Sequence, residues 1–126
     1  MTNKAERSLY ERLGGYDAIA AATDDLLQRV TSDPDIGVYW KGHSKDSMKR
    51  DRQLVVDFLC AALGGPTIYR GRDMKTSHEG LGISEGDWEV FVKHTLATLD
   101  KFEVHGKERE EFLAAAVSLK GDIVEG

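Results

Sequence analysis

The sequence predicts an all-α protein, and three observations support this prediction. Apolar residues recur at the three- to four-residue spacing of amphipathic helices along almost the whole chain. Strand-like alternation of useful length is missing. Glycine or proline stands at most points where the apolar pattern stops, which is where helices are expected to end. The residues therefore predict several helices joined by short connections, a pattern that makes neighbouring helices antiparallel.

The first forty residues predict two helices and a corner. A short helix through Leu9 and Leu13 ends at a glycine pair. A second helix begins near Asp17, an acceptable cap, and ends before Asp33. It stops there because the proline that follows disfavours a helical conformation in the preceding residue. Residues 36–40 predict a single helical turn or a corner.

A long helix and a glycine-rich loop follow. The helix begins near Ser44 or Asp46 and ends at the Gly-Gly-Pro run that starts at Gly64. Its apolar residues form one wide stripe, as expected of a helix with one buried face. A short helical turn is expected around residues 75–79, within the loop.

Two further helices complete the chain. Ser84 followed by Asp87 is a variant of the capping box and predicts a helix start, with apolar residues at helical spacing as far as Phe102. The last helix is expected over residues 108–124. Two long helix pairs with a loop between them suit two-over-two packing, although an ordinary small helical bundle would show the same periodicity.

Composition narrows the class of protein. A chain of 126 residues is expected to form a single domain over 1–126, with residues 1–7 as a flexible N-terminal extension. The formal net charge of −5 indicates neither nucleic-acid nor anionic-membrane binding. Cys60 is the only cysteine, so no intramolecular disulfide forms, as expected in a reducing cytoplasm. The polar N-terminus lacks a signal-peptide pattern, and we expect a cytoplasmic protein without membrane spans.

The most informative stretch is the loop that carries His78. It runs from Gly64 to Ile83 and contains five of the thirteen glycines of the chain, and its histidine stands near the end.

 The five glycines stand at positions 64, 65, 71, 80 and 82. These glycines let the backbone bend around a large flat group. A histidine on a short segment between two long helices can direct a ring nitrogen into the space between them, and a neutral imidazole is a good ligand for iron.

Two motifs identify a family that this chain resembles. Leu-Tyr-x-x-Leu-Gly-Gly occupies residues 9–15, and Gly-Gly-Pro…Tyr…Gly-Arg-x-Met-Lys-x-x-His occupies residues 64–78. In this order and at this spacing, the chain resembles the truncated haemoglobins, most closely their first group, from about residue 8 to about residue 124. The resemblance implies a two-over-two helical sandwich with haem between the helix pairs. The segment Met74 to His78 in its glycine frame therefore favours this fold over an ordinary bundle.

The resemblance also implies a set of haem-binding residues. His78 matches the proximal iron ligand, and no Cys-x-x-Cys-His attachment site is present, so a non-covalent haem b is expected. His43, His94 and His105 have weaker claims. The other residues expected around the haem are Trp40, Phe58, Leu59, Tyr69, Met74, Lys75, Ile83 and Phe91. The basic run at 45–52 is expected to be a solvated helix face, with pairing to the haem propionates as the alternative.

The distal side departs from the family pattern. Relatives of the first group commonly have tyrosine where this chain aligns Leu27 and glutamine where it aligns Val55, and both side chains would donate hydrogen bonds to a bound gas. Here both positions are apolar, and Leu54 is expected beside them. The residues whose reach to this distal pocket stays open are His43, Arg50, Asp51 and Gln53.

The expected function is reversible binding of diatomic gases (O2, CO and NO) at a histidine-ligated iron, as in oxygen binding or transport. The alternatives are a haem-based gas sensor and a haem enzyme, either a nitric-oxide dioxygenase or a weak peroxidase, that takes electrons from an external reductase. Apolar Leu27 and Val55 count against the enzyme. A haem-free helical interaction module is the third reading. We expect a monomer or weak dimer.

Overall fold

The computed structural model describes residues 8–66, 69, 71 and 74–125, so the expected extension over residues 1–7 lies outside the described residues. All regular elements in the described residues are helical, which confirms the all-α prediction. In chain order they are α1 (Leu9–Arg12), α2 (Tyr16–Thr31), the 3-10 helix η2 (Gly37–Trp40), α3 (Lys45–Ala62), α4 (Met74–His78), α5 (Glu85–Lys101), α6 (Gly106–Ser118) and α7 (Lys120–Ile123).

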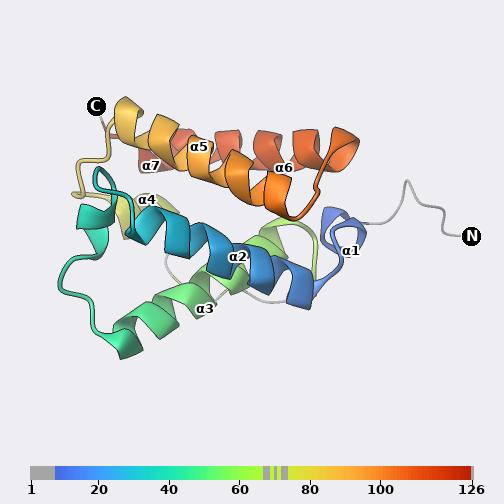
Figure 1. Cartoon of the computed structure of the whole chain (residues 1–126), viewed down its shortest axis with the longest axis horizontal. Helices are drawn as coiled ribbons and strands as arrows, with labels where there is room; N and C mark the ends of the chain where they lie inside the picture. Colours follow the sequence, from blue (N-terminus) through green and yellow to red (C-terminus); the bar gives the residue numbers. More distant parts are fainter. Residues whose placement is uncertain (1–7, 67–68, 70, 72–73, 126) are drawn as a thin grey trace, which may run out of the picture.

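The long helices form two antiparallel pairs. Figure 1 shows α2 beside α3, and ion pairs join α5 to the helices that follow it, Asp100 to Arg109 of α6 at one end and Glu85 to Lys120 of α7 at the other. Contacts between α2 and α5 join the pairs, and short α4 packs against α7 at the end of the molecule where the chain finishes. This is the two-over-two arrangement that the sequence predicted.

Local capping explains where the helices begin. The Ser44 side chain accepts a hydrogen bond from the backbone N–H of Ser47 and starts α3. Ser84 and Asp87 form the reciprocal capping box that starts α5, as predicted. After α2, the carboxylate of Asp33 accepts from the amide of Asp35 at 2.7 Å and turns the chain toward η2.

The last predicted helix is divided in the structure. Instead of one helix over residues 108–124, α6 ends at Ser118 and α7 starts at Lys120. The Ser118 hydroxyl donates to the carbonyl of Ala115 at 2.6 Å, and the Leu119 amide bonds to Ala116, three residues back. These bonds tighten the last turn of α6 and end it, because they replace the regular four-residue spacing.

A buried cluster joins the start of the chain to the end of α3. Val56 and Cys60 are fully buried, and the Tyr10 amide donates to the carbonyl of Leu63 at 2.9 Å. A Cβ at Gly65 would lie 2.6 Å from the Tyr10 ring, so only glycine fits there. The two sequence motifs are therefore packing partners at this end of the fold.

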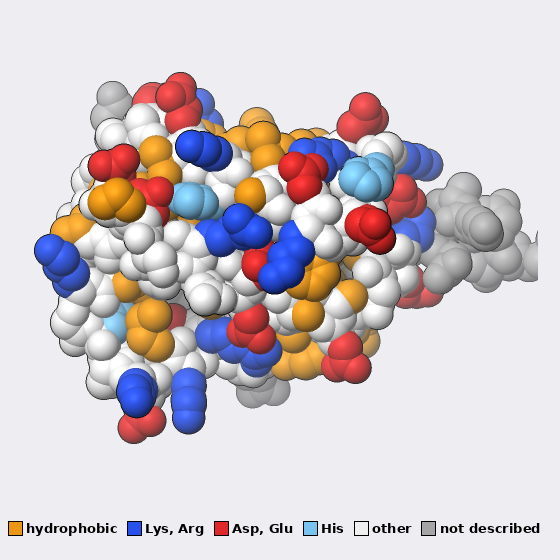
Figure 2. Space-filling view, viewed as in Figure 1, with side chains coloured by type: hydrophobic (Ala, Val, Ile, Leu, Met, Phe, Trp, Pro, Cys, Tyr) orange, Lys and Arg blue, Asp and Glu red, His pale blue; other side chains and the backbone are white. Residues whose placement is uncertain are grey.

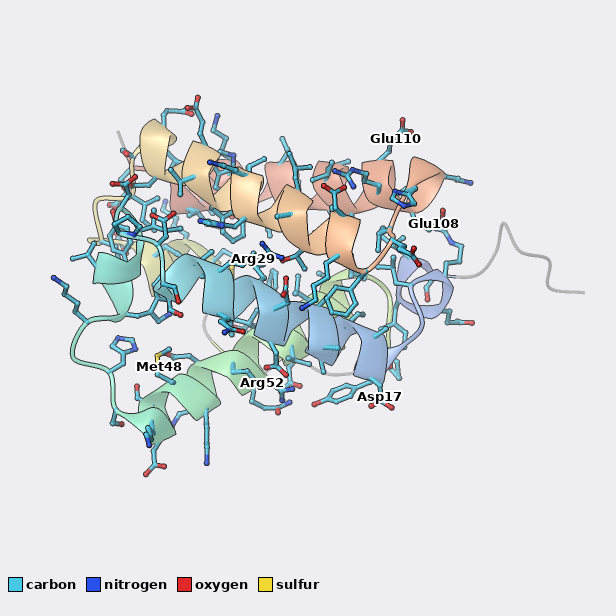
Figure 3. All side chains as sticks on the ribbon, viewed as in Figure 1. Asp17, Arg29, Met48, Arg52, Glu108 and Glu110 are labelled. Carbon is cyan, nitrogen blue, oxygen red and sulfur yellow. The ribbon has the colours of Figure 1, made fainter. Side chains whose placement is uncertain are left out.

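A second junction holds α2 against α5. The Asp25 carboxylate accepts hydrogen bonds from Arg29, from the buried hydroxyl of Thr98 at 2.7 Å and from Lys101 at 3.1 Å. Figure 3 shows Arg29 between the two helices. Burial opposes ionisation of Asp25, but these hydrogen bonds together outweigh it and lower the pKa of the carboxyl to about 2.

We expect Asp25→Ala to destabilise the fold by about 1–3 kcal/mol, because the buried Thr98 hydroxyl loses its acceptor. The lowered pKa stabilises the native state above the unfolded pKa of about 3.9, and this contribution disappears as pH falls toward 2. Urea unfolding from pH 5 to pH 2.5 measures both effects. Asp24→Ala is the matched control, because its ion pair with Arg52 is exposed and contributes at most about 1 kcal/mol. Equal losses in the two variants would contradict the assignment.

The surface carries both signs of charge. Figure 2 shows acidic and basic side chains interspersed over one face, with small apolar patches between them. In the part of the chain that the structure describes, no helix has both the length and the apolar character needed to cross a membrane.

Candidate functional site

His78 is the last residue of α4, and its ring is oriented locally. Its Nδ1 lies 2.8 Å from the backbone carbonyl oxygen of Met74, one turn earlier. A carbonyl oxygen only accepts, so Nδ1 carries the proton and the lone pair of the neutral ring is on Nε2. This is the tautomer that a metal ligand bonded through Nε2 requires, with the second ring nitrogen held by a carbonyl. The half-buried imidazole therefore has the donor chemistry that haem iron needs.

The apolar residues expected around the haem lie on several elements. Phe58 and Leu59 are half-buried on α3, next to the fully buried positions of that helix. The Phe58 ring meets the Tyr69 ring edge-on, with ring centroids 5.2 Å apart. This contact joins α3 to the segment that leads into α4, and so brings two of the predicted residues together.

The other residues predicted around the haem lie on η2, on α4, on α5 and in the segment before α5. Trp40 in η2, Ile83 before α5 and Met74 in α4 are half-buried, whereas Lys75 is exposed. Phe91 on α5 is half-buried and packs on Trp88 with ring centroids 5.6 Å apart.

Tyr39, which is not among the residues predicted around the haem, fixes η2. The Tyr39 hydroxyl donates to the Asp87 carboxylate at 2.6 Å, which joins η2 to the first turn of α5. This hydrogen bond raises the pKa of Tyr39 and lowers the pKa of Asp87. Trp40 follows Tyr39 directly, so the bond also fixes the position of the tryptophan backbone. No local pattern predicts it, because the partners are 48 residues apart.

The expected distal positions are apolar and only partly covered. Leu27 on α2 and Val55 on α3 are half-buried, and Leu54 is 36% exposed. A groove of about 570 Å³ lies between α2 and α3, and Leu27 lines it together with Met48 and Arg52. Figure 3 shows Met48 and Arg52 on α3. None of the residues that line this groove belongs to α4 or α5.

Three of the polar residues left open by the sequence have hydrogen-bond partners, and one of them, Gln53, lines the same groove as Leu27. His43 Nδ1 lies 3.1 Å from a carboxylate oxygen of Asp51, and both side chains are more than a third exposed. The Gln53 amide donates to the Tyr16 hydroxyl at 2.8 Å and to Asp57 at 2.9 Å. Arg50 is exposed.

The remaining histidines have structural positions. His94 on α5 contacts the Asp33 carboxylate at 2.7 Å, which ties the end of α2 to α5, and this hydrogen bond lowers the pKa of Asp33. His105 precedes α6 as its N-terminal cap residue. Within the described ranges, no three His, Cys, Asp or Glu side chains gather as a metal cage. A single imidazole is the donor set that haem iron uses, because the porphyrin supplies the other nitrogens.

Residues 8–125 match the family described as bacterial-like globin. The chain belongs to this globin family. It is 32% identical over 124 residues to the group 1 truncated hemoglobin GlbN of Mycolicibacterium paratuberculosis, an alignment that covers 98% of this chain and 89% of the relative. The resemblance to truncated haemoglobins of the first group is therefore confirmed, and membership of this family implies a haem-binding globin.

Solved structures confirm the fold. The truncated hemoglobin from Tetrahymena pyriformis in its Fe(III) form superposes with a TM-score of 0.86 at 25% identity, covering 95% of this globin and all of that chain. The 2/2 hemoglobin from Synechococcus sp. PCC 7002, solved in the cyanomet state with covalently attached heme, superposes with a TM-score of 0.84 at 24% identity, covering 94% and 98%.

Proposed function

We propose that this globin binds one haem b non-covalently through His78 and reversibly binds diatomic gases as a cytoplasmic monomer or weak dimer. The observation that supports this most is the bond from His78 Nδ1 to the Met74 carbonyl, because it selects the tautomer with its lone pair on Nε2. Haem, when bound, supplies an iron with one coordination position for a gas. Oxygen binding or transport is the use that this chemistry favours over catalysis.

The chain's own residues would hold and surround the haem. His78 would bind the iron, and the half-buried rings of Phe58, Tyr69 and Phe91 would contribute apolar surface that excludes water. Leu27 and Val55 would cover the opposite side without offering a hydrogen-bond donor.

Acid–ketone extraction of the purified protein tests the proposed cofactor. We expect the extraction to release one haem per chain into the organic layer and leave a colourless polypeptide, because no Cys-x-x-Cys-His site is present. The Synechococcus protein, which shares this fold, was solved with covalently attached heme, so the extraction distinguishes two modes of attachment. Colour that stays with the polypeptide would contradict a non-covalent haem b.

An apolar distal side favours fast release of dioxygen. Dioxygen gains more from a positioned donor than carbon monoxide does, and a hydrogen bond to a charged partner contributes roughly 1.5–3 kcal/mol. Its absence is expected to speed release tenfold or more, since each 1.4 kcal/mol is about a factor of ten. The enzyme alternatives need an external reductase. A peroxidase also needs a distal acid or base, which neither Leu27 nor Val55 supplies.

We expect His43→Ala to change the dioxygen release rate by less than about twofold, because the ring is held by Asp51 near the surface. Stopped-flow mixing of the oxygenated protein with dithionite measures this rate, and Lys41→Ala, on an exposed neighbour, is the control. A release rate that rises tenfold in His43→Ala alone would show that His43 donates to the gas.

A further inference from the structure

The C-terminal segment holds the turn that follows His78. The Glu125 carboxylate accepts two backbone hydrogen bonds, one from Gly80 at 3.1 Å and one from Gly82 at 2.8 Å. The Glu125 amide also donates to the carbonyl of Ile83 at 2.7 Å. Glu125 thus contacts Gly80, Gly82 and Ile83, all of which lie within five residues after His78.

The turn presents its amides as a small anion site. Gly80 and Gly82 have φ values of 85° and 71°, in the left-handed region that favours glycine. Each oxygen of the Glu125 carboxylate accepts a hydrogen bond from one of the two amides: Oε2 accepts from Gly80, and Oε1 accepts from Gly82. These bonds lower the pKa of Glu125, and the bond from Gly82 contributes most to this shift. The carboxylate therefore fits this turn in its ionised form.

The position of α7 brings Glu125 to the end of the molecule that carries His78. α7 packs against α4, which carries His78 at its end. A helix as short as α4 is too short to be stable by itself, so neighbouring contacts must set its orientation. The turn at residues 80–83 is the covalent continuation of α4, and Glu125 fixes that turn.

We propose that Glu125 is a positioning residue for the proximal histidine. It holds the turn after α4 and thereby sets the angle at which His78 meets the haem. This inference rests on the proposed haem ligation by His78. It concerns a residue that neither sequence motif contains.

The test compares Glu125→Ala and Glu125→Gln with Glu89→Ala, a control that removes an exposed carboxylate from α5. Amide hydrogen exchange of Gly80 and Gly82 in the haem-free protein reports the contact itself. The rate of haem transfer to an excess of apomyoglobin and the iron–histidine stretching band of the ferrous protein report His78. Thermal unfolding of each variant controls for global stability.

We expect Glu125→Ala to lose protection at both glycine amides, to release haem about tenfold faster and to broaden or shift the iron–histidine band. Glu125→Gln keeps one carbonyl oxygen as an acceptor and should be intermediate. If the alanine variant does not fold, the glutamine variant provides the test. Glu89→Ala should match the wild type in all measurements.

Three outcomes would overturn the inference. Unchanged protection at Gly80 and Gly82 in Glu125→Ala would show that the carboxylate does not hold the turn. Lost protection with wild-type haem release and an unchanged iron–histidine band would leave the contact with a structural role only. A wild-type protein that binds no haem would refute the proposed function, and the inference with it, while the exchange data would still report the contact.

Discussion

Replacing His78 with alanine is expected to abolish most haem retention, with the fraction of haem-loaded protein falling about tenfold or more. The structure places the lone pair of the neutral ring on Nε2, and alanine removes this ligand while leaving the apolar residues around it. The measurement is the ratio of haem absorbance to protein absorbance after purification with excess haem and gel filtration. Circular dichroism of the haem-free proteins checks that the variant keeps its helices.

His94→Ala and His105→Ala are the matched controls for this experiment. His94 is paired with Asp33, and His105 lies at the start of α6, so neither is expected to hold iron. Both variants should retain haem near the wild-type level, although His94→Ala loses the tie between α2 and α5. Loss of haem in His94→Ala together with retention in His78→Ala would show that the ligand assignment is wrong.

Leu27→Tyr is expected to slow dioxygen release about tenfold or more, by introducing a hydroxyl donor on the distal side. Leu27 is half-buried and borders the groove between α2 and α3, so the structure offers space for a larger ring on one side of it. Stopped-flow dissociation measures the effect, and carbon monoxide release should change much less. Leu27→Phe, which adds the ring without the hydroxyl, separates hydrogen bonding from bulk.

A slow wild-type release rate would contradict this account of the distal side. Leu27→Tyr would then add little, and a donor other than Leu27 or Val55 would have to be present. The residues to replace next would be His43 and Gln53, whose partners in this structure are Asp51 and Tyr16.

The helices were predictable because their signals are local. Ser84 and Asp87 cap α5 from positions three residues apart, and α2 ends at Thr31, three residues before the proline at 34. The break at Leu119 was missed because the apolar spacing continues across it. Only the hydroxyl of Ser118, bonded back to Ala115, marks that break, and serine at such a position does not by itself predict one.

The site was predictable only in part, for a related reason. His78 stands in a local motif, and its acceptor, the Met74 carbonyl, lies one helical turn away. Contacts between distant residues left no pattern in the sequence. Glu125 reaches Gly80 across 45 residues, and Asp25 reaches Thr98 across 73. Such pairs form only after the helices pack, so single-sequence periodicity does not reveal them.

The most direct test of the central claim, that His78 holds haem iron in this globin, is the absorption spectrum of the ferric, ferrous and carbon monoxide-bound wild type. We expect an intense haem band in all three forms, with a ferrous carbon monoxide spectrum typical of histidine-ligated haem that is absent from His78→Ala. A purified protein that shows no haem band after reconstitution, or a His78→Ala spectrum identical to the wild type, would contradict the claim.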